Sequence, residues 1–154
     1  SLITVIRAMD APIDTMITLQ PTNIVQCAAA LVWSPVFRKF PNLRIASIEN
    51  GAEFLPDLFR KLRSQDKKMP GYFGEDPVEQ FRRHVWINPF WEDDLQTVVS
   101  LMGADRVIFG SDWPHIEALP HPLDYLPETK PLSPEDRRLV LHDNAVGLAQ
   151  PLML

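Results

Sequence analysis

The stretch RVIFGSDWPH, residues Arg106–His115, decides the fold class of this protein. Residues 107–109 are apolar in succession, as is typical of a short strand buried on both faces. Gly110 loosens the backbone after this run, and Asp112 then places a carboxylate at the mouth of the strand. Because a buried carboxylate without a partner is costly, Asp112 is expected to meet a metal ion, an arginine or backbone N–H groups.

Two other segments read in the same way. RIASIEN (Arg44–Asn50) and HVWINP (His84–Pro89) are short and mainly apolar, and amphipathic helical patterns over residues 53–68 and 92–106 separate the three segments. Buried strands that alternate with helices belong to parallel β/α units. The sequence therefore predicts an α/β fold with about three parallel strands and flanking helices, the strands lying near residues 44–49, 85–88 and 106–110.

Start and stop signals place the helices before and between the strands. Thr22 or Asn23 can cap a helix that begins at Ile24, and Pro35 is expected to kink or interrupt that helix. Residues 78–83 are expected to form a helical turn that leads into the second strand.

Two later helices have their own signals. Glu92, Asp93 and Asp94 are expected to lie in the first turn of a helix that has Gly103 as its C-cap residue. After a proline-rich stretch, Ser133 is expected to cap the first of two short closing helices.

Composition limits the classes of partner. The chain has 154 residues, a formal net charge of -5 and one cysteine, Cys27. The acidic balance gives no general attraction to nucleic acid or to an anionic membrane, and no apolar run approaches the roughly 18 to 20 residues that span a bilayer. A single cysteine fits a reducing compartment. We therefore expect a cytoplasmic protein whose partners include neither nucleic acid nor a membrane.

Functional groups in parallel α/β folds gather where the strands end, and two predicted strands end at a carboxylate. Glu49 follows the first strand and Asp112 the third. Both also have a purely structural reading, because SDWP favours a turn and ENG suits a loop before a helix. The residues alone leave both readings open.

Three stretches together resemble the amidohydrolase-related family 2, which comprises metal-dependent hydrolases and decarboxylases and includes the aminocarboxymuconate-semialdehyde decarboxylase group. They are FPNLRIASIENGAEFLPDLFRKL (Phe40–Leu62), DRVIFGSDWPHIE (Asp105–Glu117) and HDNAVGLAQPL (His142–Leu152). The resemblance extends from about Pro12 to the end of the chain, and the strand followed by GSDWPH is its most specific part.

The resemblance implies a TIM (β/α)8 barrel whose last strand ends in a metal-binding aspartate, the position of Asp112. Such an aspartate ligates a divalent ion and handles the proton of bound water. We expect zinc, with manganese as the alternative. Substrate contacts are expected from His115, Trp113, Glu49 and Asn50, although a structural loop histidine and a rim-packing tryptophan are the competing readings for the first two.

For three further residues near the strand ends, a structural role is the favoured interpretation. Asn88 and Trp91 could line a pocket, but a turn and a packing role are the expected ones. His84 precedes a strand, which places it at the amino-terminal face of a barrel. Residues at that face serve stability rather than catalysis, so His84 is interpreted as structural.

The chain departs from the family pattern in its upstream ligands. That pattern needs an H-x-H or E-x-H pair on the first strand and a histidine after the fifth, and none of the four histidines stands there. Glu49 occupies a place where some members carry a histidine. A complete barrel needs about 250 residues. Residues 1–154 are therefore expected to be the C-terminal portion of a barrel, strands six to eight, whose incomplete site is completed by self-association or by the missing half.

The resulting hypothesis is a metal-dependent hydrolase or non-oxidative decarboxylase acting on a small carbonyl- or carboxylate-bearing substrate. One alternative is a catalytically inactive, truncated half-barrel. The other is a non-enzymatic α/β binding module with a closed core and no metal.

Overall fold

A computed structural model describes residues 24–115 and 118–150 of the chain. A helix covers residues 24–33, and the chain bends at Ser34 and Pro35 before the next helix, so the interruption expected at Pro35 is confirmed. The proposed caps Thr22 and Asn23 lie outside the described residues. The later elements are α3 (Val36–Lys39), β1 (Ile45–Ser47), α4 (Leu55–Lys68), α5 (Pro77–His84), β2 (Val85–Ile87), α6 (Leu95–Met102), η1 (Ala104–Arg106), η2 (Pro122–Thr129), α7 (Pro134–Arg138), η3 (Leu139–Asp143) and α8 (Asn144–Ala149).

The three predicted strand segments lie side by side and run parallel. β1 pairs with β2 in the register Ile45↔Val85 to Ser47↔Ile87. The third segment joins through a single parallel bridge, Ile87↔Val107, supported by the Ile108 N–H, which donates to the Ile87 carbonyl at 2.9 Å. The strands are shorter than predicted, but their parallel order brings all three carboxyl ends to one edge.

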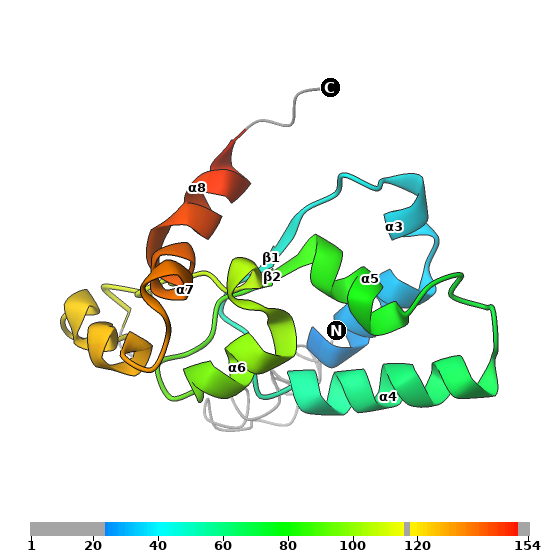
Figure 1. Ribbon diagram of the computed structural model, residues 1–154, viewed down its shortest axis with the longest axis horizontal. Helices are drawn as coiled ribbons and strands as arrows, with labels where there is room; N and C mark the ends of the chain where they lie inside the picture. The colour runs from blue at the N-terminus through cyan, green and yellow to red at the C-terminus, as the bar shows by residue number, and fades with distance from the viewer. Residues whose placement is uncertain (1–23, 116–117, 151–154) are drawn as a thin grey trace, which may run out of the picture.

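Helices pack around this small sheet, with α4, α5 and α6 on one side and α7 and α8 beyond the third segment (Figure 1). α4 buries Leu55, Leu58, Phe59 and Leu62, the apolar positions that its helical spacing predicts. α5 begins at Pro77 because the Asp76 carboxylate accepts from the Val78 and Glu79 N–H groups.

The start of α6 differs from the expectation. α6 begins at Leu95 and has no acidic residue in its first turn, so the expected placement of Glu92, Asp93 and Asp94 there is wrong. Asp94 is the N-cap residue, and its carboxylate accepts from the Gln96 N–H at 3.1 Å. The cap satisfies a free N–H of the first turn, whereas Asp93 is held by backbone groups of the preceding loops.

The two closing helices are confirmed, with Ser133 as the cap of α7, and π-helical residues Leu139–Asp143 join α7 to α8 without a break. In this stretch the Val140 carbonyl accepts from the Phe109 N–H at 2.9 Å. The wider winding of π turns alters the helix hydrogen-bond pattern and is common near functional sites. Here it holds the segment that leads to Asp112.

His84 lies at the end of β2 opposite to the carboxyl edge, as the structural reading requires. Its ring is buried, stacks on Phe37 with centroids 4.3 Å apart, and has Nδ1 2.7 Å from the Leu43 carbonyl oxygen.

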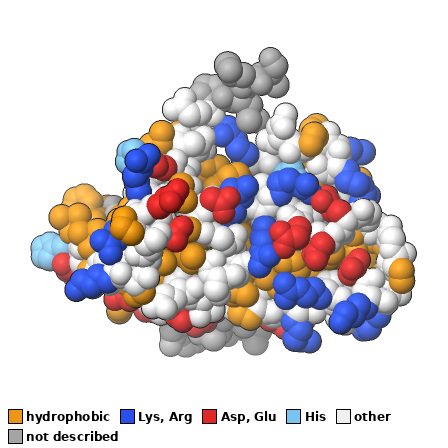
Figure 2. Space-filling model, in the orientation of Figure 1, with side chains coloured by type: hydrophobic (Ala, Val, Ile, Leu, Met, Phe, Trp, Pro, Cys, Tyr) orange, Lys and Arg blue, Asp and Glu red, His pale blue; other side chains and the backbone are white. Residues whose placement is uncertain are grey.

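The outer face over α4 and α5 carries acidic and basic side chains interspersed with one another (Figure 2). Asp57 pairs with both Arg60 and Lys61, and Arg82 pairs with Glu79. Exposed pairs of this kind contribute little to stability, so this face has the features of a solvated surface. None of the helices in the described part of the chain is both long and apolar enough to cross a membrane.

Candidate functional site

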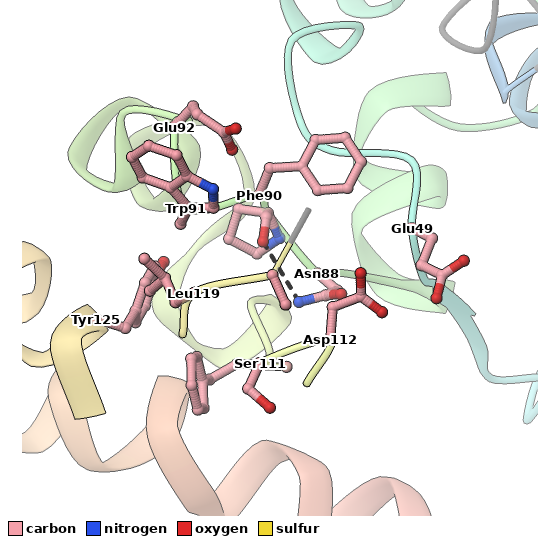
Figure 3. Close-up of a pocket in the computed structure, with 13 residues that line it drawn as sticks. Glu49, Asn88, Phe90, Trp91, Glu92, Ser111, Asp112, Leu119 and Tyr125 are labelled. Atoms are coloured by element: carbon pink, nitrogen blue, oxygen red, sulfur yellow. Dashed lines mark hydrogen bonds between the residues drawn. The ribbon is translucent and has the colours of Figure 1, made fainter. Parts of the chain in front are cut away.

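A pocket opens where the carboxyl ends of the three strand segments meet (Figure 3). Its empty space is about 840 Å³, part of it open to solvent. Residues at or after the ends of the three strand segments and one residue of η2 contribute to the lining, among them Glu49, Asn88, Trp91, Phe109, Asp112 and Tyr125. We call it the strand-end pocket.

Both predicted carboxylates line the strand-end pocket, and both have unusual backbones. Glu49 has φ 57° and Asp112 has φ 54°, and these are the described non-glycine residues with positive φ. Aspartate tolerates this left-handed region, but glutamate rarely adopts it. Backbone strain of this kind concentrates at functional sites.

Asp112 is only partly covered by its neighbours, with 36% of its side chain exposed. The His115 Nδ1 lies 3.4 Å from Asp112 Oδ2, and the His115 N–H donates to the Asp112 carbonyl at 2.8 Å. His115 is therefore placed beside the predicted ligand. It is not part of the pocket lining in the described region, but stands next to it.

The two other predicted contacts lie away from the pocket. Trp113 is 62% exposed and does not line the pocket. Asn50 does not line it either: its amide donates to the Ile48 carbonyl at 2.7 Å, and it faces a neighbouring hollow with Glu53 and Phe54.

Asn88 and Trp91, for which a turn and a packing role were expected, both line the strand-end pocket. Phe90, Glu92, Leu119 and Tyr125 were not anticipated there at all. Tyr125 comes from η2, in the proline-rich stretch that follows the third segment, and its ring stacks on Phe109 with centroids 4.9 Å apart. A large aromatic residue between prolines, shortly after the last strand, is the sequence feature that could have indicated a place for Tyr125 in the pocket wall.

Asp93 fixes the loop that carries Phe90 and Trp91. One of its carboxylate oxygens accepts from the Phe90 N–H at 2.8 Å and from the Ala52 N–H at 2.9 Å. Burial raises the pKa of the Asp93 carboxyl, although both N–H donors act to lower it. Gly51 permits this close approach: it has φ +61°, and a Cβ there would come within 2.7 Å of the Phe90 ring.

The Tyr125 hydroxyl is enclosed and has no hydrogen-bond partner among the described residues. Burial raises the pKa of Tyr125 to about 12, and the nearby Asp93 and Glu128 carboxylates act in the same direction. The folded state therefore holds this proton more tightly than the unfolded state. That contribution to stability is complete below about pH 10 and is lost as pH rises towards 12.

Tyr125→Phe is expected to remove this alkaline loss. Between pH 9 and pH 12 the wild-type free energy of unfolding should fall by about 2 kcal/mol more than that of the variant, after allowance for solvent screening. At pH 7 the variant should be as stable as the wild type or more stable by up to about 1 kcal/mol, because an unpaired buried hydroxyl is lost. Urea unfolding at several pH values measures this, with the exposed Tyr72→Phe as the control. Equal slopes for wild type and Tyr125→Phe contradict the assignment.

The described residues do not supply a complete metal site. Among residues 24–115 and 118–150, no group of three or more His, Cys, Asp or Glu side chains could hold a metal ion. A catalytic zinc normally has about three protein ligands, and the described part of the chain offers Asp112 as the one predicted ligand. The donor set found here therefore does not fit a catalytic metal by itself.

Comparisons with known proteins agree with the α/β fold. A family model described as Amidohydrolase matches residues 1–148. Among solved structures, a crystal structure of an amidohydrolase from Mycobacterium avium subsp. paratuberculosis K-10 matches with a TM-score of 0.83 and 39% sequence identity. That match covers 90% of this chain and 36% of the other, so the chain spans about a third of the length of that relative. A comparison with curated proteins found no match.

Proposed function

Because the chain belongs to the amidohydrolase family, we propose that it forms the C-terminal part of a (β/α)8 barrel in a metal-dependent hydrolase or non-oxidative decarboxylase. The observation that carries this proposal is the placement of Asp112 at the carboxyl end of the third parallel segment, on the pocket wall. In barrels of this kind, groups at the carboxyl ends of strands perform the chemistry.

The solved relative supports the partial-barrel interpretation. This chain covers 36% of that protein, and its parallel segments correspond in number to strands six, seven and eight of an eight-stranded barrel. We propose that strands one to five come from polypeptide outside the described residues, in a longer protein or a partner chain. We also propose a cytoplasmic location, on the grounds given by composition, and a small-molecule substrate, on the grounds of the family.

The metal part of the proposal gives Asp112 the role of one ligand to zinc or manganese, with the remaining ligands from the proposed upstream strands. A bound divalent ion would supply Lewis acidity at this edge of the sheet. The chain's own contribution is the carboxylate, held by the positive-φ backbone of Asp112 beside His115. Glu49 faces the same pocket and is proposed to contact the substrate.

A chimera tests this function. The matching segment of the Mycobacterium amidohydrolase is replaced by this chain, so that five foreign strands complete the barrel. We expect close to one zinc or manganese ion per folded chimera by elemental analysis, and less than about a tenth of that for the 154-residue chain alone, because one carboxylate does not hold a catalytic metal. A folded chimera without metal contradicts the proposal, as does stoichiometric metal on the isolated monomer.

The lack of a three-ligand cluster among the described residues is compatible with two candidates, because the first draws its other ligands from the proposed upstream strands. The second candidate is a catalytically silent half-barrel. That reading requires the folded chimera to contain no metal, so the same measurement separates the two candidates. A binding module unrelated to enzymes has no such support, since the family match covers nearly the whole chain.

A further inference from the structure

A groove runs between α4 and α6 on the surface of the molecule, where these two helices lie next to each other (Figure 1). It consists of two open hollows that share Pro56 and Leu101 at their border. The charged side chains that line one hollow are Arg60, Arg63 and Lys67, and those that line the other are Glu53, Glu92, Asp93 and Asp94. Within the described part of the chain, no residue of the opposite sign lines either hollow. We call them the basic half and the acidic half of the α4–α6 groove.

The basic half is a regular stripe on α4. Arg60, Arg63 and Lys67 are separated by three and four positions, which places them on one side of the helix. Arg60 already pairs with Asp57 at 2.6 Å. Arg63 and Lys67 are exposed and form no ion pair with a residue of the described ranges. Both positive charges are therefore available to a partner.

In the acidic half, two of the four carboxylates already serve the fold. Asp93 accepts from backbone N–H groups of two loops, and Asp94 caps α6. Glu53 and Glu92 are exposed, and neither has an ion-pair partner among the residues that the structure describes. Burial raises the pKa of the Asp93 carboxyl, and the Glu53 and Glu92 carboxylates act in the same direction, because like charges close together resist ionisation. This crowding of negative charge favours a positively charged group on the open side of the groove.

A second copy of this chain matches both halves at once. A two-fold axis through the border at Pro56 and Leu101 places the basic half of each copy on the acidic half of the other, with the two α4 helices antiparallel. Every opposite-charge contact then occurs twice, as in the isologous interfaces of two-fold dimers. A partner carrying a single sign of charge would match one half and be repelled by the other. The charge pattern therefore selects this chain itself as the partner.

We propose that the α4–α6 groove is the interface of a homodimer, in which Arg63 and Lys67 of each copy pair with Glu53 and Glu92 of the other. The exposed Pro56 and the half-buried Leu101 lie at the axis, where they contribute apolar contact. Exposed ion pairs are individually weak, so the dimer depends on several of them at once and on low ionic strength. This inference goes beyond the proposed function, since it involves neither a metal nor turnover, and the metal content of the chimera leaves it unaffected.

Sedimentation velocity of the 154-residue chain tests the proposal. At a chain concentration of about 100 µM we expect mainly dimer in about 20 mM NaCl, and a dissociation constant of the dimer at least about 10-fold higher in about 0.5 M NaCl. A chain that remains monomeric at low salt overturns the proposal. An assembly that salt leaves intact also overturns it, because its contacts would be of another kind.

Charge reversals locate the contact. Arg63→Glu and Glu53→Lys each turn two attractive contacts of the dimer into repulsive ones, so each is expected to raise the dissociation constant at least about 10-fold in low salt. Lys68→Glu and Glu135→Lys are the matched controls, because both residues are exposed outside the groove, and they should change the constant by less than about 3-fold. Net charge does not account for this pattern, since Glu53→Lys makes the formal net charge of -5 less negative and would otherwise favour association.

Exchanging the two charges supplies the sharpest comparison. In the double variant Arg63→Glu/Glu53→Lys opposite charges face each other again, so its dissociation constant should be at least about 3-fold below that of either single variant. An equimolar mixture of the two single variants should also associate more tightly than either alone, because a mixed dimer has opposite charges at both contacts.

Circular dichroism first establishes that each variant is folded, and Lys67→Glu takes the place of Arg63→Glu if the latter does not fold. Single reversals that associate as tightly as the wild type overturn the α4–α6 groove as the interface. The same conclusion follows if the double variant or the mixture regains no affinity.

Discussion

Replacing Asp112 with asparagine is expected to lower the metal affinity of the chimeric barrel at least about 100-fold. Substituting residues that merely support a metal ligand costs roughly 10- to 100-fold, so losing a direct ligand should cost more. Asparagine keeps the shape of the side chain but lacks the negative charge that a divalent ion requires. Elemental analysis and metal titration of the folded chimera measure the loss.

Asp124→Asn is the matched control, because Asp124 is an exposed aspartate in η2 that does not line the strand-end pocket. The same chemical change there should leave metal content unaltered. If Asp112→Asn retained full metal occupancy, Asp112 would have only a turn-forming role, the reading that SDWP also permits.

Asn144→Ala is expected to lower the free energy of unfolding of the chain by about 2 to 4 kcal/mol, since two hydrogen bonds are lost and two carbonyls are left without this donor. The buried Asn144 amide donates to the Ala104 carbonyl at 2.8 Å and to the Val107 carbonyl at 2.7 Å. These bonds fasten α8 to the start of the third strand segment. Urea unfolding followed by circular dichroism measures the change.

Two further variants sharpen this test. Asn144→Asp keeps the shape but places a carboxylate against two carbonyl oxygens, so its destabilisation should equal or exceed that of Asn144→Ala at pH 7. Asn42→Ala removes an exposed asparagine and should change stability by less than about 0.5 kcal/mol. A loss below about 0.5 kcal/mol in Asn144→Ala would show that the helix is held mainly by its apolar contacts.

The three residues Asp143, Asn144 and Ala145 belong to the last of the stretches that resemble the family. The sequence alone does not explain why an asparagine stands there. The structure gives a physical reason for it. The Asn144 side-chain amide has two N–H donors on one nitrogen. That buried nitrogen donates to both the Ala104 and the Val107 carbonyls. Nothing in the local sequence indicates that contact, because it joins residues about forty positions apart.

Local patterns were sufficient for the three strand segments and for the buried face of α4. Apolar runs predicted the three parallel segments, and the spacing of Leu55, Leu58, Phe59 and Leu62 predicted the buried face of α4. The local pattern gave the wrong start for α6, because each of the three consecutive acidic residues before it is compatible with the first turn of a helix. Tertiary contacts assigned them different tasks: Asp94 caps the helix and Asp93 joins two loops.

The sequence by itself determined the α/β class, the family, and the two carboxylates that end strands, because each depends on residue types at fixed short spacings. The tertiary structure alone decided which loop residues meet. It brought Tyr125 and Asn88 to the wall beside Asp112 and left Trp113 and Asn50 outside it. A pocket is formed by residues distant in the chain, and their meeting is set by parallel strand pairing and by long-range hydrogen bonds such as Phe109 N–H to the Val140 carbonyl. No short spacing encodes those contacts, which is why the composition of the pocket wall had to be read from the fold.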